Sequence, residues 1–311
     1  MNRIAFLLVP GLHLLDLAGP AQVFSTAAET GLPYRLAYIA DHEPAGGPDH
    51  EPEVPTAQGV PLRAPAAWPD LTAADTVLVP GWRWGPGPVH APPVSAGAAR
   101  RLAAHHAAGG TVASVCAGAF ALAHAGLLDG RRCTTHHELQ DVLARRHPRA
   151  TVVRDVLYVT DGRVVTSAGI ASGIDLALHM VAARHGPAAA ARVARAMVVY
   201  ARRNGDQPQA GAMLRHRSHL SDPVHRAQDL IDAGYTRPLP LHRLAAAAGV
   251  SERTLTRRFT AATGLTPLRY QQELRLEHAE QLIAQGATTD AAARAVGFTD
   301  ARMLRRLRAR P

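Results

Sequence analysis

The residue best suited to covalent chemistry in this sequence is Cys116, which lies between an apolar strand-like run and an apolar helix-like run. The segment reads TVASVCAGAFALAHAGLLDG over residues 111–130. A thiol at a tight strand-to-helix turn lies near the free N–H groups of the helix, and these favour the thiolate. The Ala-Gly-Ala that follows permits a strained turn, as in a nucleophile elbow. We therefore expect a reactive thiol, with a buried structural cysteine as the alternative. Cys133 lacks this context and is expected to be structural.

A second kind of chemistry is indicated by arginines in the segment LHRLAAAAGVSERTLTRRF, residues 241–259. Ala245 precedes Gly249 by four positions and apolar residues recur downstream at helical spacing, a pattern typical of a helix-turn-helix. Ser251 is expected to cap the second helix by accepting hydrogen bonds from its free N–H groups. An arginine on the outer face can read guanine or bind phosphate. The outer face is predicted to carry Arg253, Thr256 and Arg257.

The same pattern recurs 48 residues later, where Ala293 precedes Gly297 by four positions. A long helix near 266–284 is expected to join the two copies. Paired copies are far more specific than a single match, and they could place two recognition helices in successive major grooves about 34 Å apart. The second recognition helix is predicted to present Arg302, Arg305 and Arg306.

The first two-thirds of the chain predict the elements that position Cys116. Apolar or β-branched runs separated by helical patterns indicate a mostly parallel sheet that is covered on both faces. Residues 42–69 are rich in Pro and Gly and are expected to be a loop with at most a short hairpin. Strands are expected at 4–9, 34–40, 76–80, 111–115, 152–160 and 163–169. Helices are expected at about 16–30, 94–108, 118–126, 136–147, 171–185 and 187–201.

The length of 311 residues suggests two domains. Residues 1–190 form the predicted α/β domain, an amidotransferase-like sandwich by the resemblance given below. Residues 191–222 contain a helix end and then little periodicity, which indicates a linker. Residues 223–311 are rich in Ala, Leu and Arg and predict an all-α domain of two helix-turn-helix units.

The charge is divided unevenly between these parts. All 34 basic residues are arginine, and with 25 acidic residues they leave a formal charge of +9. Residues 1–190 hold 14 Arg and 15 acidic residues, whereas residues 191–311 hold 20 Arg and 10 acidic residues. This asymmetry favours nucleic acid or an anionic membrane surface as a partner of the C-terminal part. A solvated arginine-rich surface is the alternative.

Other compositional features exclude several classes of protein. No uncharged apolar run reaches 18 residues, so no membrane span is expected. Two cysteines and a six-residue apolar run near the start favour a cytoplasmic protein without a signal peptide. The histidines lack Cys or carboxylate partners at ligand spacing, and there is no phosphate-binding glycine loop, so neither a metal nor another cofactor is expected.

Two resemblances extend these interpretations. Residues 224–307 resemble the AraC/XylS-type DNA-binding domain through GVSERTLTRRFTAATGLTPLRYQQELRLEHAEQLI and AARAVGFTDARMLRRL. This resemblance implies base-reading positions for the six residues named above. Arg308 occupies a place where that family usually has an aromatic residue, and we expect it to contact phosphate or solvent.

Residues 3–185 resemble the superfamily of the PfpI protease, the Parkinsonism-associated protein and isonitrile hydratase. The similarity lies in VPGLHLLDLAGPAQVF, SVCAGAFALAHAGLLDGRRCTTHHEL and VVTSAGIASGIDLALHMV. It implies that Asp16 lies near Cys116 and that His136 is the third member of the site, although His137 replaces the usual Trp and leaves open which histidine points inward. The expected ligand pocket adjoins this site, where Trp82 and Trp84 either close the pocket or pack in the core. Its residues are Gly81, Trp82 and Ala117.

Together the two resemblances match the GlxA-type branch of AraC-family transcription regulators. We expect a DNA-binding regulator that binds a double-stranded operator, dimerises through its N-terminal domain and senses a small metabolite near Asp16, Cys116 and His136. One alternative is a cysteine-dependent hydratase or amidase. Another is a redox sensor in which a low-pKa Cys116 is oxidised.

Overall fold

The computed structural model describes residues 1–41, 51–84, 94–199, 205–206, 209, 216–217, 219–284 and 286–308. The chain forms two compact units, Met1–Gln209 and Ala210–Pro311. The boundary lies inside the 191–222 segment expected to hold a helix end and a linker. Among the helices of the described ranges, none is both long and apolar enough to cross a membrane.

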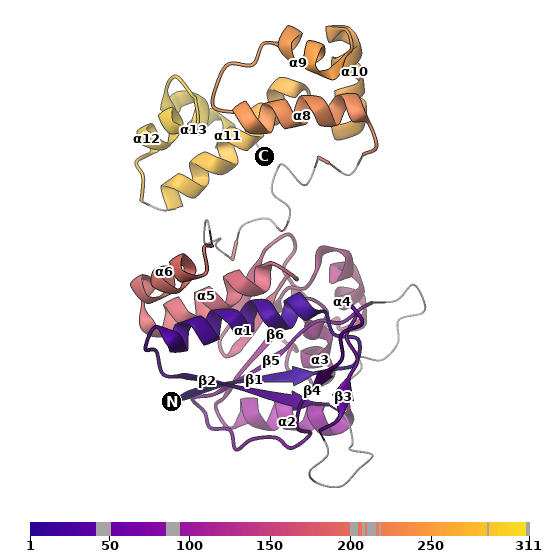
Figure 1. Ribbon diagram of the computed structural model, residues 1–311, viewed down its shortest axis with the longest axis vertical. Helices are drawn as coiled ribbons and strands as arrows, with labels where there is room; N and C mark the ends of the chain where they lie inside the picture. The colour runs from indigo at the N-terminus through magenta and orange to yellow at the C-terminus, as the bar shows by residue number, and fades with distance from the viewer. Residues whose placement is uncertain are drawn as a thin grey trace. The chain divides into compact units, whose positions relative to one another are not determined.

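The first unit is built on a six-stranded sheet with the order β2-β1-β5-β6-β10-β9 (Figure 1). Neighbouring strands are parallel except β9, which runs antiparallel to β10 along the edge. The inner strands are buried on both faces, which explains their continuous apolar sequences. The strands are β1 Asn2–Leu8, β2 Tyr34–Ala40, β5 Thr76–Val79, β6 Thr111–Val115, β9 Tyr158–Asp161 and β10 Val164–Ser167.

Helices cover both faces of this sheet. α1 packs with α5 and α6 on one face, and α2 packs with α3 on the other (Figure 1). The helices are α1 Leu14–Glu29, α2 Ala96–Ala107, α3 Gly118–His124, α4 Gln140–Arg146, α5 Ser172–His185 and α6 Pro187–Ala196. The predicted α/β sandwich with a mostly parallel sheet is thus confirmed.

Several predicted elements differ in detail. The strand expected at 152–160 is divided, because Asp155 adopts a left-handed conformation with φ of 49° between its two halves. Its first half, β8 Thr151–Val152, pairs with β7 Arg132–Cys133 in a separate small sheet. Within 42–69, the described part holds an antiparallel pair, β3 Glu53–Val54 and β4 Leu62–Arg63. The helix expected at 136–147 begins with a 3-10 turn, His137–Leu139.

The second unit is helical and has two apolar cores. One core surrounds Phe259 and Tyr270, the other Phe298 and Leu304. The long helix α11 contributes to both cores, and the helix groups α8–α10 and α12–α13 lie toward its two ends (Figure 1). The helices are α8 Asp222–Gly234, α9 Leu241–Ala248, α10 Glu252–Thr263, α11 Pro267–Ala284, α12 Thr289–Ala295 and α13 Ala301–Arg308. The prediction of an all-α domain is therefore confirmed.

Candidate functional site

Cys116 lies in the sharp turn between β6 and α3. Its φ of 54° is the strained left-handed conformation expected of a nucleophile elbow. Its N–H donates to the Ser167 carbonyl at 3.1 Å, which ties the turn to β10. A Cβ on Gly118 would lie 2.1 Å from the Val79 carbonyl oxygen, so this position requires glycine. The local sequence therefore forms the turn that its small residues predict.

Asp16 is fully buried in the first turn of α1 and faces the elbow. Its Oδ1 accepts a hydrogen bond from the Ile170 N–H at 2.9 Å, whereas its buried Oδ2 accepts no standard hydrogen bond from the described residues. A Cβ on Gly81 would lie 2.5 Å from Asp16 Oδ2 and 2.6 Å from Cys116 Cβ. The loop after β5 can therefore approach the carboxyl group and the elbow only with glycine at this position.

The charged forms of Asp16 and Cys116 are both disfavoured. Burial raises the pKa of Asp16 to about 6, although polar contacts with the Ile170 and Gly81 amides and the Cys116 thiol oppose the shift. Burial, and then the Asp16 charge, raise the pKa of Cys116 far above that of a free thiol. The Ala117 N–H opposes this shift but does not outweigh it. Burial therefore disfavours the thiolate that the turn alone is expected to favour.

His136 is the histidine that lies beside the cysteine. A Cβ on Gly169 would lie 3.1 Å from both Cys116 Sγ and His136 Cδ2, so the two side chains border the same small space. His137 is exposed instead, and its ring packs 4.2 Å from that of His136. Burial, followed by the nearby charge of His137, lowers the pKa of His136, although Glu138 at 3.8 Å opposes the shift. At neutral pH the site therefore holds a neutral imidazole.

The residues expected to line a ligand pocket have different surroundings. A Cβ on Gly81 would also lie 2.9 Å from the Ala117 nitrogen, so Gly81 and Ala117 both adjoin the thiol. Trp82 is only 6% exposed and belongs to the apolar core. Its ring stacks 6.4 Å from Trp84, which packs against Phe120 at 4.5 Å. These contacts favour the packing interpretation of both tryptophans.

Other residues of this site were not singled out from the sequence. Gly169 separates Cys116 from His136, and Ile170 binds Asp16 from a strained backbone with φ of 40°. Ser172 holds this turn, because its hydroxyl accepts from the Gly169 N–H at 2.7 Å. The family resemblance included the segment VVTSAGIASGIDLALHMV, but it did not indicate these roles. Within the described ranges, no cluster of His, Cys, Asp or Glu has the arrangement of a metal site.

The first helix-turn-helix of the second unit has the expected local structure. Gly249 ends α9 with φ of 69°, and the Ser251 hydroxyl caps α10 by accepting from the Thr254 N–H at 3.3 Å. Leu255 and Phe259 are fully buried. The opposite face of α10 borders a shallow hollow that also includes Leu241, Glu252 and Thr260. It contains all three residues predicted to read bases, Arg253, Thr256 and Arg257.

The second helix-turn-helix repeats this arrangement. Thr288 caps α12 by accepting from the Ala291 N–H at 3.2 Å, and Gly297 forms the turn with φ of 87°. Leu304 and Leu307 are buried on α13. The exposed face carries Arg302, Arg305 and Arg306. Arg308 instead lies 3.6 Å from Glu280 of α11, so it has a protein partner in addition to any contact with phosphate or solvent.

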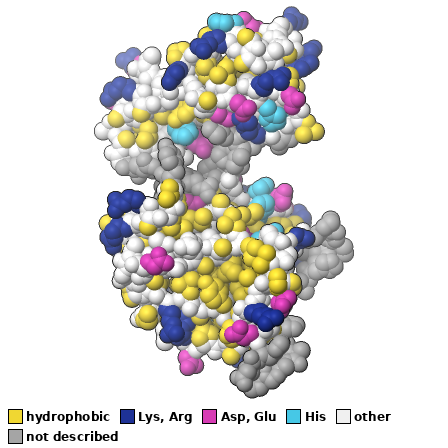
Figure 2. All heavy atoms as spheres, viewed as in Figure 1, with side chains coloured by type: hydrophobic (Ala, Val, Ile, Leu, Met, Phe, Trp, Pro, Cys, Tyr) yellow, Lys and Arg dark blue, Asp and Glu magenta, His cyan; other side chains and the backbone are white. Residues whose placement is uncertain are grey.

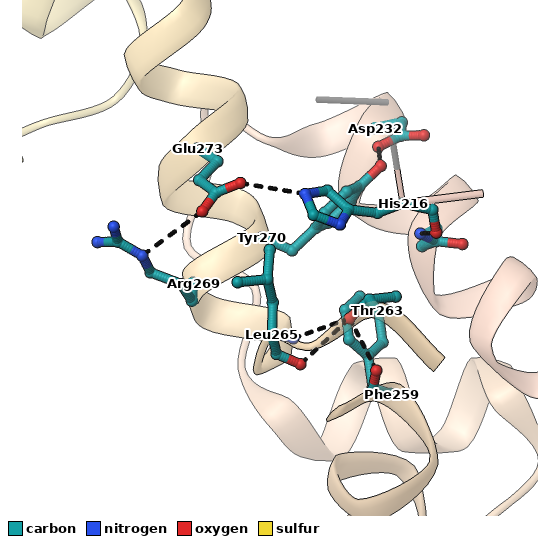
Figure 3. Close-up of polar contacts among 9 residues, drawn as sticks. His216, Asp232, Phe259, Thr263, Leu265, Arg269, Tyr270 and Glu273 are labelled. Atoms are coloured by element: carbon teal, nitrogen blue, oxygen red, sulfur yellow. Dashed lines mark hydrogen bonds and ion pairs between the residues drawn. The ribbon is translucent and has the colours of Figure 1, made fainter. Parts of the chain in front are cut away.

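Partly buried polar contacts connect the elements around the first recognition helix (Figure 3). The Tyr270 hydroxyl of α11 donates to Asp232 of α8 at 2.8 Å, and His216 contacts Glu273 of α11 at 3.2 Å. The Thr263 hydroxyl donates to the Phe259 carbonyl at 2.7 Å and so satisfies the end of α10. Burial and the Asp232 charge raise the pKa of Tyr270, which remains a neutral donor.

Comparisons with known proteins agree with this division into two units. Residues 2–183 match the DJ-1/PfpI family, and residues 244–310 match a helix-turn-helix domain. The HTH-type transcriptional regulator GlxA of Rhizobium meliloti is 29% identical over 302 residues, covering 92% of this chain and 85% of that protein. The HTH-type transcriptional regulator GbdR of Pseudomonas aeruginosa is 32% identical over 178 residues, covering 57% of this chain and 48% of that protein. The match thus spans about half the length of GbdR.

A solved structure has a fold similar to that of part of this chain. The crystal structure of an AraC family transcriptional regulator from Pseudomonas putida aligns with a TM-score of 0.51 and 21% identity. The alignment covers 63% of this chain and 100% of that chain. At this level of identity the similarity concerns the fold alone.

Proposed function

Because this chain belongs to the DJ-1/PfpI family and ends in a helix-turn-helix domain, we propose that it is a sequence-specific DNA-binding transcription regulator. The observation that carries this proposal is the pair of exposed recognition faces on α10 and α13, each opposite its own apolar core. Arginine side chains are exposed on the visible face of the second unit (Figure 2). Arginines there suit the phosphates and guanine edges of duplex DNA.

We further propose that the first unit senses a small molecule at Asp16, Cys116 and His136. The site offers a neutral thiol, a neutral imidazole and a buried carboxyl group, one oxygen of which accepts no standard hydrogen bond from the described residues. Such groups can bind a ligand through hydrogen bonds, whereas nucleophilic catalysis and thiol oxidation both need thiolate. This environment therefore favours sensing over a hydratase, an amidase or a redox switch. A ligand changes the affinity for DNA only if it binds the DNA-bound arrangement of the protein and the DNA-free arrangement with different affinities.

Dimerisation through the first unit is part of the same proposal. Leu15 on α1 and Tyr38 on the edge strand β2 are 45% and 40% exposed. Tyr38 lines an apolar groove of about 480 Å³ that also includes Leu36, Leu62 and Leu17. Hydrophobic side chains also gather on the visible face of this unit (Figure 2). A homodimer formed in this way in the cytoplasm would bind two operator half-sites, one with each protomer.

Genome-wide binding mapping tests the regulator proposal. The full chain should enrich discrete DNA sites that share a sequence motif. A variant that combines Arg253→Ala, Arg257→Ala and Arg305→Ala should lose this enrichment, while Arg195→Ala on α6 should keep it. The absence of enriched sites for the unaltered protein would overturn the proposal. Genes beside the recovered sites would indicate the metabolites to test as ligands, with His136→Ala as the variant expected to lose the ligand-induced thermal shift.

A further inference from the structure

The loop between α8 and α9 is held by two side chains of α11. Arg275 donates from Nε to the Tyr235 carbonyl at 2.6 Å and from Nη2 to the Arg237 carbonyl at 3.0 Å. Gln271 donates from Nε2 to the same two carbonyls, at 2.9 and 2.7 Å. Four donor contacts therefore converge on the two carbonyl oxygens that flank Thr236. This loop leads directly into the first helix-turn-helix.

The same loop touches the turn of the second helix-turn-helix. A Cβ on Gly297 would lie 1.9 Å from the Thr236 carbonyl oxygen, so the two backbones approach too closely for any other residue at this position. The Arg275 guanidinium also lies 5.5 Å from the centre of the Phe298 ring. One side chain thus contacts both the α8–α9 loop and the second helix-turn-helix at the point where their backbones meet.

A shared support is needed because the two recognition helices belong to different cores. Leu255 of α10 is in the core around Phe259, and Leu304 of α13 is in the core around Phe298. Tyr235 packs against both cores, and its ring stacks 4.6 Å from His278 of α11. The α8–α9 loop is therefore where a small displacement would change the angle between α10 and α13.

We propose that Arg275, assisted by Gln271, is a positioning residue that sets the spacing and orientation of the two recognition helices. It touches no DNA in this role. It holds the two helix-turn-helix motifs rigidly together, so that they bind two DNA elements at a fixed separation. Rigid coupling matters because the second binding event is strengthened only when both elements can be engaged at once. This inference rests on the proposed DNA-binding function and adds the residue that determines spacing specificity.

Binding measurements on the full chain test the proposal. Arg275→Met keeps an unbranched apolar side chain but removes the charge and the donors, and Arg195→Met removes the same charge from the first unit. The DNA probes are a site recovered by selection with the unaltered protein, the same site with one base pair added between its two elements, and each element alone. Arg275→Met should weaken binding to the intact site at least about tenfold, because the linkage advantage is lost.

The affinity of Arg275→Met for each single element should stay within about twofold of that of the unaltered protein. Adding one base pair between the elements should reduce the affinity of Arg275→Met less than it reduces that of the unaltered protein. Equal loss on single elements would show a merely structural role and overturn the proposal. If Arg275→Met and Arg195→Met bind all the DNA probes with the same affinities, the positioning role is overturned as well.

A second measurement does not depend on DNA. Spin labels at Arg258→Cys on α10 and Met303→Cys on α13 occupy exposed positions, whereas Cys116 and Cys133 are buried. The distance distribution should be narrow in the otherwise unaltered chain and broader with Arg275→Met. If the unaltered protein selects no DNA, the regulator proposal fails while the label distances still decide the positioning role. Identical distributions with and without Arg275→Met would overturn it.

Discussion

Asp16 and Cys116 both border the space that a side chain on Gly81 would fill. A Cβ at that glycine would lie 2.5 Å from the Asp16 carboxyl oxygen and 2.6 Å from Cys116 Cβ. The loop after β5 therefore encloses the carboxyl group and the thiol and removes them from water. The Asp16 charge makes ionisation of the thiol more costly, whereas the contact with the thiol eases ionisation of Asp16. At neutral pH the elbow therefore holds a neutral thiol beside a carboxyl group that ionises above its pKa of about 6.

Replacement of Asp16 by Asn should alter how stability depends on pH. Between pH 4 and 6 Asp16 is largely ionised in the unfolded chain but protonated in the fold, because its pKa rises from 3.8 to about 6. The native state then binds more protons, so the stability contributed at low pH is lost as pH rises through this window. The full loss is about 3 kcal/mol. Asp16→Asn should lack this pH-dependent loss of stability. The unfolding free energy of Asp16→Asn minus that of the unaltered protein should therefore increase from pH 4 to pH 7.

Urea unfolding followed by tryptophan fluorescence measures this difference. All three tryptophans, Trp68, Trp82 and Trp84, belong to the first unit, so the signal reports the unit that contains Asp16. Parallel stability curves for the two proteins across pH 4 to 7 would contradict the raised pKa.

The thiol of Cys116 should react slowly with iodoacetamide at pH 7 to 8. Its raised pKa and 7% exposure both limit attack by the thiolate. Asp16→Asn removes the neighbouring negative charge and should increase the rate. Mass spectrometry of the alkylated peptides checks this, with the buried Cys133 as an internal reference. Rapid alkylation of Cys116 at pH 7 in the unaltered protein would instead favour the enzymatic or redox alternative.

Replacement of Cys116 by Ala should leave the affinity for a specific DNA site nearly unchanged when no small molecule is present. The cysteine belongs to the first unit, whereas the proposed DNA-reading faces lie on α10 and α13. Gel-shift titration measures the affinity, and circular dichroism checks the fold. Loss of folding would show that the side chain mainly supports the elbow.

Replacement of Arg257 by Ala should weaken binding to a specific operator by about 1–3 kcal/mol, because a base-reading arginine contributes on this scale. Arg195→Ala removes the same charge from α6 and is the matched control. Gel-shift titrations against the operator and an unrelated duplex separate base reading from phosphate attraction. An equal loss on both duplexes would assign Arg257 to phosphate contact.

Replacement of Tyr270 by Phe should destabilise the second unit by about 2 kcal/mol, because the Asp232 carboxylate loses a partly buried hydrogen bond. Tyr38→Phe, which removes a hydroxyl from the first unit, is the control. Hydrogen exchange of the full chain should show reduced protection in peptides from α8 and α11. Unchanged protection there would mean that the hydrogen bond is not needed to hold these helices together.

Much of the fold was predictable because its causes are local. Continuous apolar runs such as residues 76–79 form strands buried on both faces, and Gly249 and Ser251 end one helix and begin the next through their own backbone and side chain. The division of 152–160 was not predictable in this way. It depends on Asp155 in a left-handed conformation and on the pairing of Val152 with the distant Cys133.

The sequence by itself determined the α/β unit, the elbow around Cys116 and the two helix-turn-helix units, because helical period, continuous apolar runs and caps act between residues a few positions apart. Only the tertiary structure decided that the thiol is neutral and that His136 lies beside it. It also decided that Arg275 connects the loop before the first helix-turn-helix with the second one. These properties depend on burial and on charges from distant segments. A pKa or a close backbone approach follows from that packing and cannot be predicted from neighbours in the chain.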